Sequence, residues 1–370
     1  MSEGILYLTL RTFSATGGIE KVSRQVGKAL YELTLGKAGT PLTVMSMYDR
    51  DEELNEKYFP AAAFKGYGEK KVLFMWYALR AGLKAKVIIL SHVNLLLAGW
   101  LIKLFSPKTK LVLFCHGIEV WEPLPARKRK MLKHCDQFIA VSHFTRDKLV
   151  EIQGIDPNKI KILNNCLDPF LALPNSLEKE NILMERYHLD SSHKVLMTLT
   201  RLSSREKYKG YDNVLYAVQQ LKFSWPGIKY LVVGKYDDAE KRRLEEMIQK
   251  LSLQGDIILA GFIPDEELAA HFGIADVYIM PSKKEGFGIV FIEAMYYGKP
   301  VIAGDKDGSV DALDNGRFGL LVDPDNIQEI TKAIATVLDN KEHYLPSYQE
   351  VINRFSFPVY KENLLRILDL

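Results

Sequence analysis

A glycine-rich loop between a strand and a helix near residue 285 has the composition of a phosphate-binding turn. The apolar run Val277 to Met280 predicts a buried strand, and a helical pattern of apolar residues begins at Ile289. Gly286 and Gly288 lie between them and let the backbone come close to a ligand. The helix start offers backbone N–H groups and the positive end of a dipole, which suit an anion. The loop alone is also compatible with a tight connection that binds nothing.

Two glutamates extend this pattern. Glu285 precedes the glycines and Glu293 lies one turn into the helix, so both can face the same cleft. The run Glu285-Gly286-Phe287-Gly288, with seven residues between the two glutamates, resembles the nucleotide-sugar signature of retaining GT-B glycosyltransferases, in particular glycosyltransferase family 4. The resemblance implies that Glu285 holds sugar hydroxyls, that Glu293 holds ribose hydroxyls, and that Gly286, Phe287, Gly288 and Ile289 bind the donor.

A basic segment follows the predicted strand Lys194–Thr200. It carries Arg201 before a leucine and Lys209 before a glycine. Arginine offers a planar fork and lysine a point charge, and both neutralise phosphate oxygens. The segment resembles the family's Arg-Leu and Lys-Gly motifs, whose cations bind the donor diphosphate. Lys207 competes with Lys209 for this role, because the loop is rich in charge.

A second glycine turn lies near the N-terminus. The apolar run Ile5 to Leu10 predicts a buried strand, and a helical pattern runs from about Ile19 to Leu33. Gly17 and Gly18 stand immediately before that helix, again a phosphate-compatible arrangement. The alternative is a tight turn without a ligand. In the resembling family this loop covers the donor diphosphate.

His116 comes directly after the predicted strand Leu111–Cys115. Open α/β sheets bind ligands at the carboxyl ends of their strands, which favours a functional histidine here. The alternative is a solvated or capping histidine. The segment from His116 to Trp121 resembles the family's histidine-containing loop near the donor sugar.

Composition restricts the function classes. The chain has 370 residues, 47% hydrophobic and 26% charged, with a net charge of +3, which is too small to indicate nucleic acid. Its three cysteines form neither a disulfide framework nor a zinc site and suit a reducing compartment. The N-terminal stretch lacks a secretory signal, and the apolar run Val87 to Phe105 contains polar residues that favour strand plus helix over a membrane span. These features favour a cytoplasmic protein.

Strands alternate with helices along the whole chain, which predicts doubly wound parallel sheets. Further strands are expected at 42–47, 87–91, 137–141, 160–163, 229–233, 256–260 and 301–303, and helices at 70–82, 95–105, 144–152, 238–251 and 265–272. With the resemblance, this pattern implies two Rossmann-like domains facing a central cleft. Residues 1–168 would bind the acceptor, with a last helix at 356–370 packing back on them. Residues 169–355 would bind the nucleotide sugar.

The chain departs from the family pattern in places. At the hinge that closes the first domain the family has Asn-Gly, whereas this chain has Asn165-Cys166. Asp307-Gly308-Ser309-Val310-Asp311 stands where the family has Gly-Gly and then Glu. Three Asp-x-Asp matches, which begin at Asp49, Asp305 and Asp323, are read as turns rather than as a metal site.

The resemblance implies a metal-independent reaction without a cofactor. The leaving phosphate would be stabilised by Arg201, Lys209 and the helix starts near Gly18 and Ile289. The expected donor is GDP-mannose or a UDP-hexose, and the acceptor is a glycan or a lipid-linked molecule in cell-surface polysaccharide or glycolipid biosynthesis. Two alternatives stay open: another GT-B enzyme, such as an epimerase or a phosphorylase, and a non-catalytic sugar-nucleotide-binding protein.

Three stretches of the first half suit an anionic membrane surface. Residues 126–134 carry five Lys and Arg, and Val72–Tyr77 and Trp100–Phe105 add aromatic and basic residues. The alternative is a solvated basic helix face with the aromatic residues in the core. Membrane contact would make the protein peripheral on the inner face of the membrane.

Overall fold

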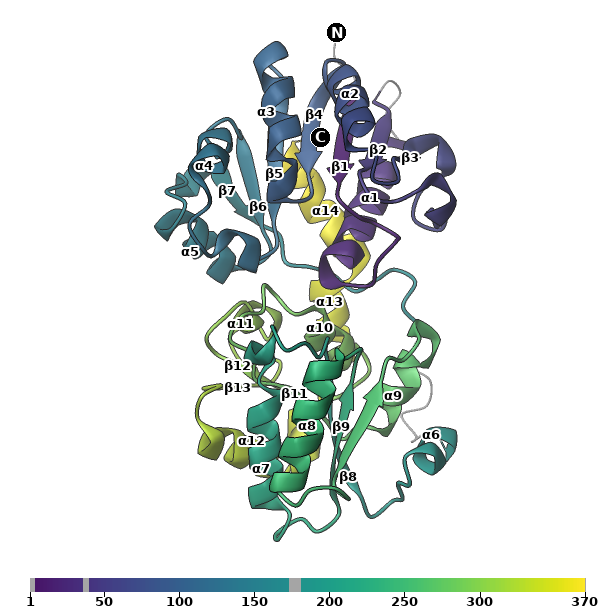
Figure 1. Ribbon diagram of the computed structural model, residues 1–370, viewed down its shortest axis with the longest axis vertical. Helices are drawn as coiled ribbons and strands as arrows, with labels where there is room; N and C mark the ends of the chain where they lie inside the picture. The colour runs from purple at the N-terminus through teal and green to yellow at the C-terminus, as the bar shows by residue number, and fades with distance from the viewer. Residues whose placement is uncertain (1–3, 36–39, 173–180, 370) are drawn as a thin grey trace. The chain divides into compact units, whose positions relative to one another are not determined.

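The computed structural model describes residues 4–35, 40–172 and 181–369 and divides into two compact units. The first unit comprises residues 1–169 together with 355–370, and the second comprises residues 170–354. Each unit is built on one parallel sheet with helices around it (Figure 1). The α/β class with two doubly wound sheets, which the alternating pattern predicts, is confirmed.

Seven parallel strands form the sheet of the first unit, in the order β3-β2-β1-β4-β5-β6-β7. Their bounds are β1 Gly4–Thr9, β2 Leu42–Ser46, β3 Phe64–Gly66, β4 Ala85–Leu90, β5 Lys110–Cys115, β6 Gln137–Ala140 and β7 Ile160–Ile162. The strand order reverses between β1 and β4, which are paired with Leu8 opposite Leu90. Such a reversal opens a crevice at the carboxyl ends of the strands, where doubly wound sheets bind ligands.

The helices of the first unit follow the strands in sequence. They are α1 Gly18–Leu35, α2 Lys71–Gly82, α3 Leu96–Phe105, α4 Ala126–Leu132, α5 His143–Glu151 and α14 Phe357–Leu368, with short 3₁₀ turns at Asp51–Glu53, Ala61–Ala63, Val93–Leu95, Ile118–Val120 and Pro157–Lys159. The apolar faces of these helices and the strands enclose a core that includes Phe74, Ile102 and Leu113. This arrangement leaves the strand-to-helix loops at the sheet's carboxyl edge free to carry function.

The last helix, α14, belongs to the first unit although it follows the whole second unit in sequence (Figure 1). It packs on α1, where Lys361 Nζ lies 2.6 Å from Glu32 Oε2. Lys110 of β5 donates a hydrogen bond to the carbonyl of Leu368 at 3.2 Å. The C-terminal helix α14 therefore packs on α1 and β5.

Six parallel strands form the sheet of the second unit, in the order β10-β9-β8-β11-β12-β13. The bounds are β8 Lys194–Leu199, β9 Ile228–Val233, β10 Ile257–Gly261, β11 Val277–Met280, β12 Val301–Gly304 and β13 Leu320–Val322. The helices are α6 Asn181–Arg186, α7 Tyr211–Leu221, α8 Asp238–Lys250, α9 Leu268–Ile274, α10 Ile289–Tyr296, α11 Ser309–Ala312, α12 Ile327–Asp339 and α13 Tyr348–Phe355, with 3₁₀ turns at Lys207–Lys209, Asp265–Glu267 and Lys341–Tyr344. Here the order reverses between β8 and β11.

Several elements differ from the expectation. The sequence pattern did not indicate β3 or β13, each of which is three residues long. The expected last helix at 356–370 is present as α14, which begins at Phe357 with Pro358 in its first turn, where proline is tolerated. The helix directly before it, α13, was not expected. The stretch 87–105 forms β4 and α3 as expected. None of the helices in the described part of the chain has the length and apolar character that a membrane span requires.

Candidate functional site

The loops after β8 and β11 meet at the strand-order reversal of the second unit. These two strands are neighbours in the sheet, with Met197 opposite Tyr278, and both loops leave their carboxyl ends. The first loop carries Arg201 and Lys209, and the second carries Glu285. Sequence positions that are far apart are thus brought together where a doubly wound sheet binds its ligand.

Lys209 and Glu285 form an ion pair across these loops. The Nζ atom of Lys209 donates a hydrogen bond to Glu285 Oε2. The side chains are 13% and 19% exposed, so the pair is partly shielded from water. Burial lowers the pKa of Lys209, but the charge of Glu285 and its hydrogen bond outweigh burial and hold this pKa above its usual value. The lysine is therefore a fixed positive charge at the reversal point.

Gly210 fixes the position of Lys209 relative to β11. Its backbone has φ +81°, and a Cβ at this position would lie 2.0 Å from the carbonyl oxygen of Pro281. A glycine is required on both counts. The N–H of Lys283 also donates to the carbonyl of Tyr208 at 2.9 Å. The backbones of the two loops are thus in direct contact on either side of the Lys209 side chain.

Asp307, in the loop after β12, holds the backbone of the loop that contains Glu285, Gly286 and Gly288. Its carboxylate accepts hydrogen bonds from the N–H groups of Glu285 at 2.7 Å and Ser309 at 2.9 Å. The N–H of Gly308 donates to the carbonyl of Glu285 at 2.8 Å, and a Cβ on Gly308 would lie 2.0 Å from the carbonyl oxygen of Gly286. Asp307 is 1% exposed, and burial raises its pKa to about 7 against the hydrogen bonds that lower it. Glu285 is consequently positioned through its backbone, and its side chain can serve another purpose.

The helix start expected at Ile289 is present. Gly288 is the N-cap of α10 with φ +85°, and having no side chain it leaves the first turn of the helix uncapped. Phe287 and Ile289 are buried at 1% and 7% exposure. Glu293 is also buried, at 2% exposure, one turn along α10. The backbone of the first turn of α10 and the Lys209–Glu285 pair therefore lie on the same loop system.

Arg201 stands apart from this pair. Its side chain is 71% exposed and forms an ion pair with Glu206 of the same loop. Of the two cations expected to meet a diphosphate, the structure thus places Lys209 beside Glu285 and leaves Arg201 at the surface of the loop.

The glycine turn of the first unit is held by a buried aspartate. Asp49 is fully buried and accepts hydrogen bonds from the N–H groups of Thr12 at 2.6 Å and Ser14 at 3.0 Å, and from Ser46 Oγ at 2.7 Å. The loop then reaches the start of α1, where a Cβ added at Gly18 would meet no atom within 4 Å. A Cβ added at Gly17 would instead lie 2.5 Å from Glu20 Oε2, so a carboxylate of α1 lies beside this glycine.

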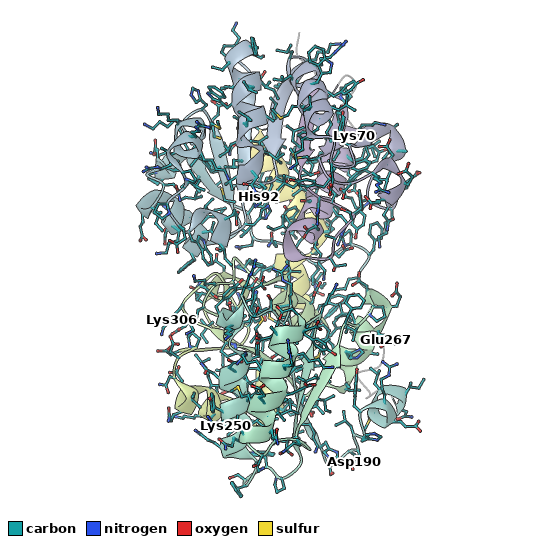
Figure 2. All side chains as sticks on the ribbon, viewed as in Figure 1. Lys70, His92, Asp190, Lys250, Glu267 and Lys306 are labelled. Carbon is teal, nitrogen blue, oxygen red and sulfur yellow. The ribbon has the colours of Figure 1, made fainter. Side chains whose placement is uncertain are left out.

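His116 lies near this turn in the sheet order, after β5. Its Nε2–H donates to the carbonyl of Ser91 at 2.7 Å, and its backbone N–H donates to Glu119. The Nδ1 atom is buried and has no hydrogen-bond partner among the described residues. Neighbouring His92, labelled in Figure 2, has a pKa lowered to about 4, chiefly because burial disfavours its charged form. Because Nε2 carries the proton, the unpartnered Nδ1 of His116 is a hydrogen-bond acceptor.

Two of the Asp-x-Asp matches hold buried carboxylates that anchor the loops in which they lie. Asp49 and Asp307 both accept backbone hydrogen bonds. A carboxylate that follows a buried strand by a few residues was the only sequence signal. In the third match, Asp323 and Asp325 form ion pairs with Lys306, which Figure 2 labels. Across residues 4–35, 40–172 and 181–369, no group of three or more His, Cys, Asp or Glu is arranged to hold a metal.

Family models match both halves of the chain. The model described as Glycosyltransferase Family 4 matches residues 16–169, and the model described as Glycosyl transferases group 1 matches residues 182–353. The first match begins in the glycine turn of the first unit, and the second contains every candidate residue of the second unit. Together they cover nearly all of the chain.

Curated proteins with related sequences include mannosyltransferases. The chain is 30% identical over 240 residues to a GDP-mannose-dependent alpha-(1-6)-phosphatidylinositol monomannoside mannosyltransferase of Mycolicibacterium smegmatis, covering 62% of this chain and 61% of that protein. It is 28% identical over 198 residues to mannosylfructose-phosphate synthase of Agrobacterium fabrum, covering 52% and 42%. The matches thus span about three fifths or less of the length of these relatives.

Solved structures share the fold over the full chain. HepE of Anabaena in complex with UDP and glucose superposes with a TM-score of 0.79 at 19% identity, covering 99% of both chains. Sucrose-phosphate synthase from Thermosynechococcus elongatus gives a TM-score of 0.75 at 20% identity, covering 99% of this chain and 98% of that one. At these identities the likeness concerns the fold.

Proposed function

Because the chain belongs to glycosyltransferase family 4 and has the GT-B fold, we propose that it moves a hexose from a nucleotide diphosphate sugar to a glycan or lipid-linked acceptor. The observation that carries the proposal is the Lys209–Glu285 ion pair beside the start of α10. A positive charge and uncapped helix N–H groups next to a carboxylate suit a ligand with both phosphates and hydroxyls.

In the proposed reaction the bond between the anomeric carbon and the donor's phosphate oxygen breaks, and the acceptor oxygen bonds to that carbon. The acceptor's proton passes to the departing phosphate. Negative charge grows on that phosphate, and a fixed ammonium at Lys209 lowers the barrier because it stabilises this charge without reorganising. Transfer with retention of configuration and without a metal is part of the proposal, as the family resemblance implies.

The other candidate residues take supporting roles in the proposal. Glu285 holds sugar hydroxyls once the donor phosphates attract Lys209, and Glu293 holds the ribose. The unpartnered Nδ1 of His116 takes a sugar hydroxyl. Arg201 is 71% exposed, and it approaches the diphosphate only when a donor draws it from Glu206. Gly17 and Gly18 supply a second helix start for phosphate.

We further propose that the first unit binds the acceptor and the second binds the donor. The named donors are GDP-mannose, which the mycobacterial relative uses by its name, and a UDP-hexose, since HepE was solved with UDP. The proposed pathway class is the synthesis of a cell-surface polysaccharide or a glycolipid.

Release of nucleoside diphosphate from a panel of GDP- and UDP-sugars tests the proposal. The expected result is release that depends on one donor and rises with an added glycan or lipid-linked acceptor, together with a higher melting temperature with that donor. A donor that raises the melting temperature but is never consumed would identify a non-catalytic sugar-nucleotide-binding protein. A donor converted without an acceptor, by change of its sugar, would identify an epimerase.

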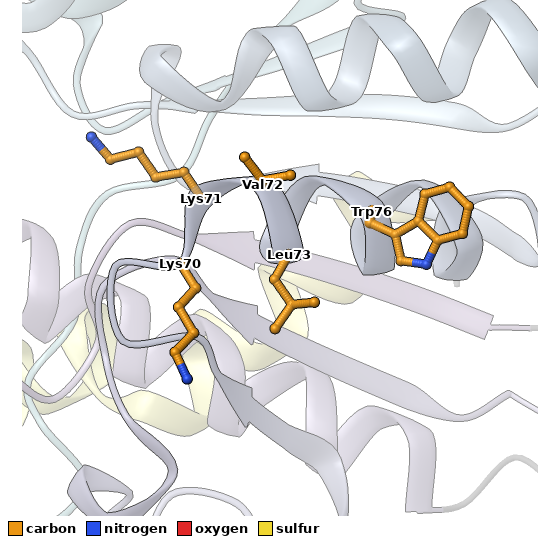
Figure 3. A pocket seen from close by; sticks show the side chains of 5 residues that line it. All are labelled: Lys70, Lys71, Val72, Leu73 and Trp76. Carbon is orange, nitrogen blue, oxygen red and sulfur yellow. The ribbon is translucent and has the colours of Figure 1, made fainter.

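The proposal includes peripheral contact with an anionic membrane on its inner face. The three stretches singled out in the sequence fall on α2, α3 and α4, and α3 contacts both of the others. On α2, Phe74 is buried, whereas Val72 and Trp76 are 86% and 59% exposed. Figure 3 shows that Val72 and Trp76 line a surface hollow together with Leu73 and with Lys70 and Lys71 at the start of the helix. Exposed apolar residues beside lysines suit the interface of an anionic bilayer.

Co-sedimentation with vesicles tests this contact. We expect binding to vesicles that contain anionic phospholipid, weaker binding at higher salt, and little binding to neutral vesicles. Trp76→Ser should weaken binding, whereas Phe223→Ser, which removes an 85% exposed phenylalanine of the second unit, should not. Equal and negligible sedimentation with both kinds of vesicle would remove the membrane contact and leave the transferase proposal intact.

A further inference from the structure

The loop that carries Arg201 and Lys209 is braced at both ends on a single helix, α8. Near its start, Asp237 accepts hydrogen bonds from Ser203 Oγ at 3.1 Å and from the N–H of Ser204 at 3.0 Å. The same carboxylate caps α8 by accepting the N–H of Glu240 at 2.8 Å. The start of the cationic loop is therefore tied to the first turn of α8.

The end of the loop is tied one turn further along the same helix. Arg243 of α8 donates from Nη1 and Nη2 to the two carboxylate oxygens of Asp212, at 2.9 and 2.6 Å. The guanidinium also donates to both carboxylate oxygens of Glu240, from Nε at 2.9 Å and from Nη2. Tyr211 Oη donates to Glu240 at 2.7 Å. Tyr211 and Asp212 are the first two residues of α7, directly after Lys209 and Gly210.

This network holds charge inside the protein. Glu240 is fully buried. Burial raises its pKa, but hydrogen bonds from Arg243 and Tyr211 outweigh burial and hold the pKa below its usual value, so the carboxylate stays ionised. Buried ion pairs of this kind add little net stability compared with apolar side chains, and their best-attested use is to select one arrangement of the elements they join. Here the selected arrangement is that of α7, and hence of Lys209, on α8.

We infer that Arg243 is a positioning residue for Lys209, acting through Asp212 and through the Glu240–Tyr211 hydrogen bond. The inference rests on the proposed role of Lys209 in the transfer reaction. Between Lys209 and the network stands only Gly210, whose backbone is confined by Pro281. A shift of the first turn of α7 must therefore move the Lys209 backbone, because only one conformationally confined residue connects the two.

The test replaces Arg243 conservatively. Arg243→Lys keeps the positive charge but cannot engage both carboxylates bidentately. We expect kcat for the donor to fall about 10- to 100-fold, since small displacements of a catalytic group cost rates of this order, while KM changes less. Tyr211→Phe, which removes only the hydroxyl, should cause a smaller fall in kcat. Arg242→Lys is the matched control, because Arg242 is the neighbouring exposed arginine on the same helix.

A second readout follows Lys209 itself, without reference to activity. The rate at which an amine-specific reagent modifies Lys209, relative to exposed Lys207, is measured by mass spectrometry on the folded protein. We expect Arg243→Lys to raise the relative rate at Lys209 severalfold and Arg242→Lys to leave it unchanged. A purely structural role for Arg243 would instead lower the melting temperature while kcat and the labelling ratio stay at their wild-type values, and that result would overturn the inference. If the wild-type chain consumes no donor, the proposed function fails, whereas the labelling ratio still tests the positioning.

Discussion

The backbone N–H of Glu285 donates a hydrogen bond to the carboxylate of Asp307 at 2.7 Å, and Glu285 uses its own carboxylate to bind Lys209. Asp307 comes from the loop after β12 and Lys209 from the loop before α7, so Glu285 links the loops of three neighbouring strands. A residue held by its backbone can exchange the partner of its side chain without moving its loop. This arrangement suits a carboxylate that must release a lysine when a ligand arrives.

Asp307 gives the protein a defined pH dependence. Its folded pKa of about 7 lies above the unfolded value of 3.8, so the folded state binds more protons between these values. The free energy of unfolding should therefore fall, relative to that of Asp307→Asn, as pH rises from about 4 to about 7, and stay level above. Chemical denaturation of both proteins across this range measures the difference. A difference that is constant, or that grows with pH, would contradict the assignment.

Gly308 should not tolerate a side chain. Gly308→Ala places a Cβ 2.0 Å from the carbonyl oxygen of Gly286, so the glycine loop must shift. We expect a loss of about 1–3 kcal/mol in the free energy of unfolding, as for other overpacked positions, together with weaker donor binding. Gly255→Ala is the control, because a Cβ there meets no atom within 4 Å. Similar stability and donor affinity in the two variants would show that the loop adapts.

Removing the charge at Lys209 should impair the chemistry more than the fold. In Lys209→Ala we expect turnover to fall roughly 10²–10³-fold, as when one donor to a developing oxyanion is lost, with a near-native melting temperature. Lys207→Ala is the control, since Lys207 is exposed in the same 3₁₀ turn. Initial rates of nucleoside diphosphate release distinguish them. Near-normal turnover in Lys209→Ala would mean that another group stabilises the leaving phosphate.

Activity should survive EDTA. Several carboxylates in the Asp-x-Asp matches already have partners: Asp307 accepts backbone N–H groups, and Asp323 and Asp325 bind Lys306. We expect the rate of donor consumption to be the same with EDTA as with added Mg²⁺ or Mn²⁺. Activity that disappears in EDTA and returns with either ion would refute metal independence.

Much of the fold could be predicted from local pattern. The strands from Ile5 and from Val277 are apolar runs, and the helix at Ile289 follows a glycine loop. Both parallel sheets, and the order in which they occur along the chain, could therefore be predicted. The strands β3 and β13 were not predicted; each lies at an end of its sheet and pairs with a single neighbour, β2 or β12.

Only part of the candidate site could be predicted from the sequence. Glycine turns and cations leave signals in the sequence, because their chemistry is local. The burial of Asp49 and Asp307 and the pairing of Arg243 with Asp212 depend on contacts between residues about 20 to 37 positions apart, for which a single sequence carries no pattern. The exposure of Arg201 could not be predicted either. Its ion pair with Glu206 depends on the conformation of the loop that contains both residues.

The place of α14 has a consequence for how the protein is made. A nascent chain emerges from the ribosome with its N-terminus first, and domains generally fold as units as they emerge. The sheet of the first unit is synthesised first, yet the helix that packs on α1 is synthesised after all of the second unit. In the nascent chain, the surface of α1 that α14 later covers therefore stays exposed until the second unit has been synthesised. During translation, that surface is where we expect chaperones to bind.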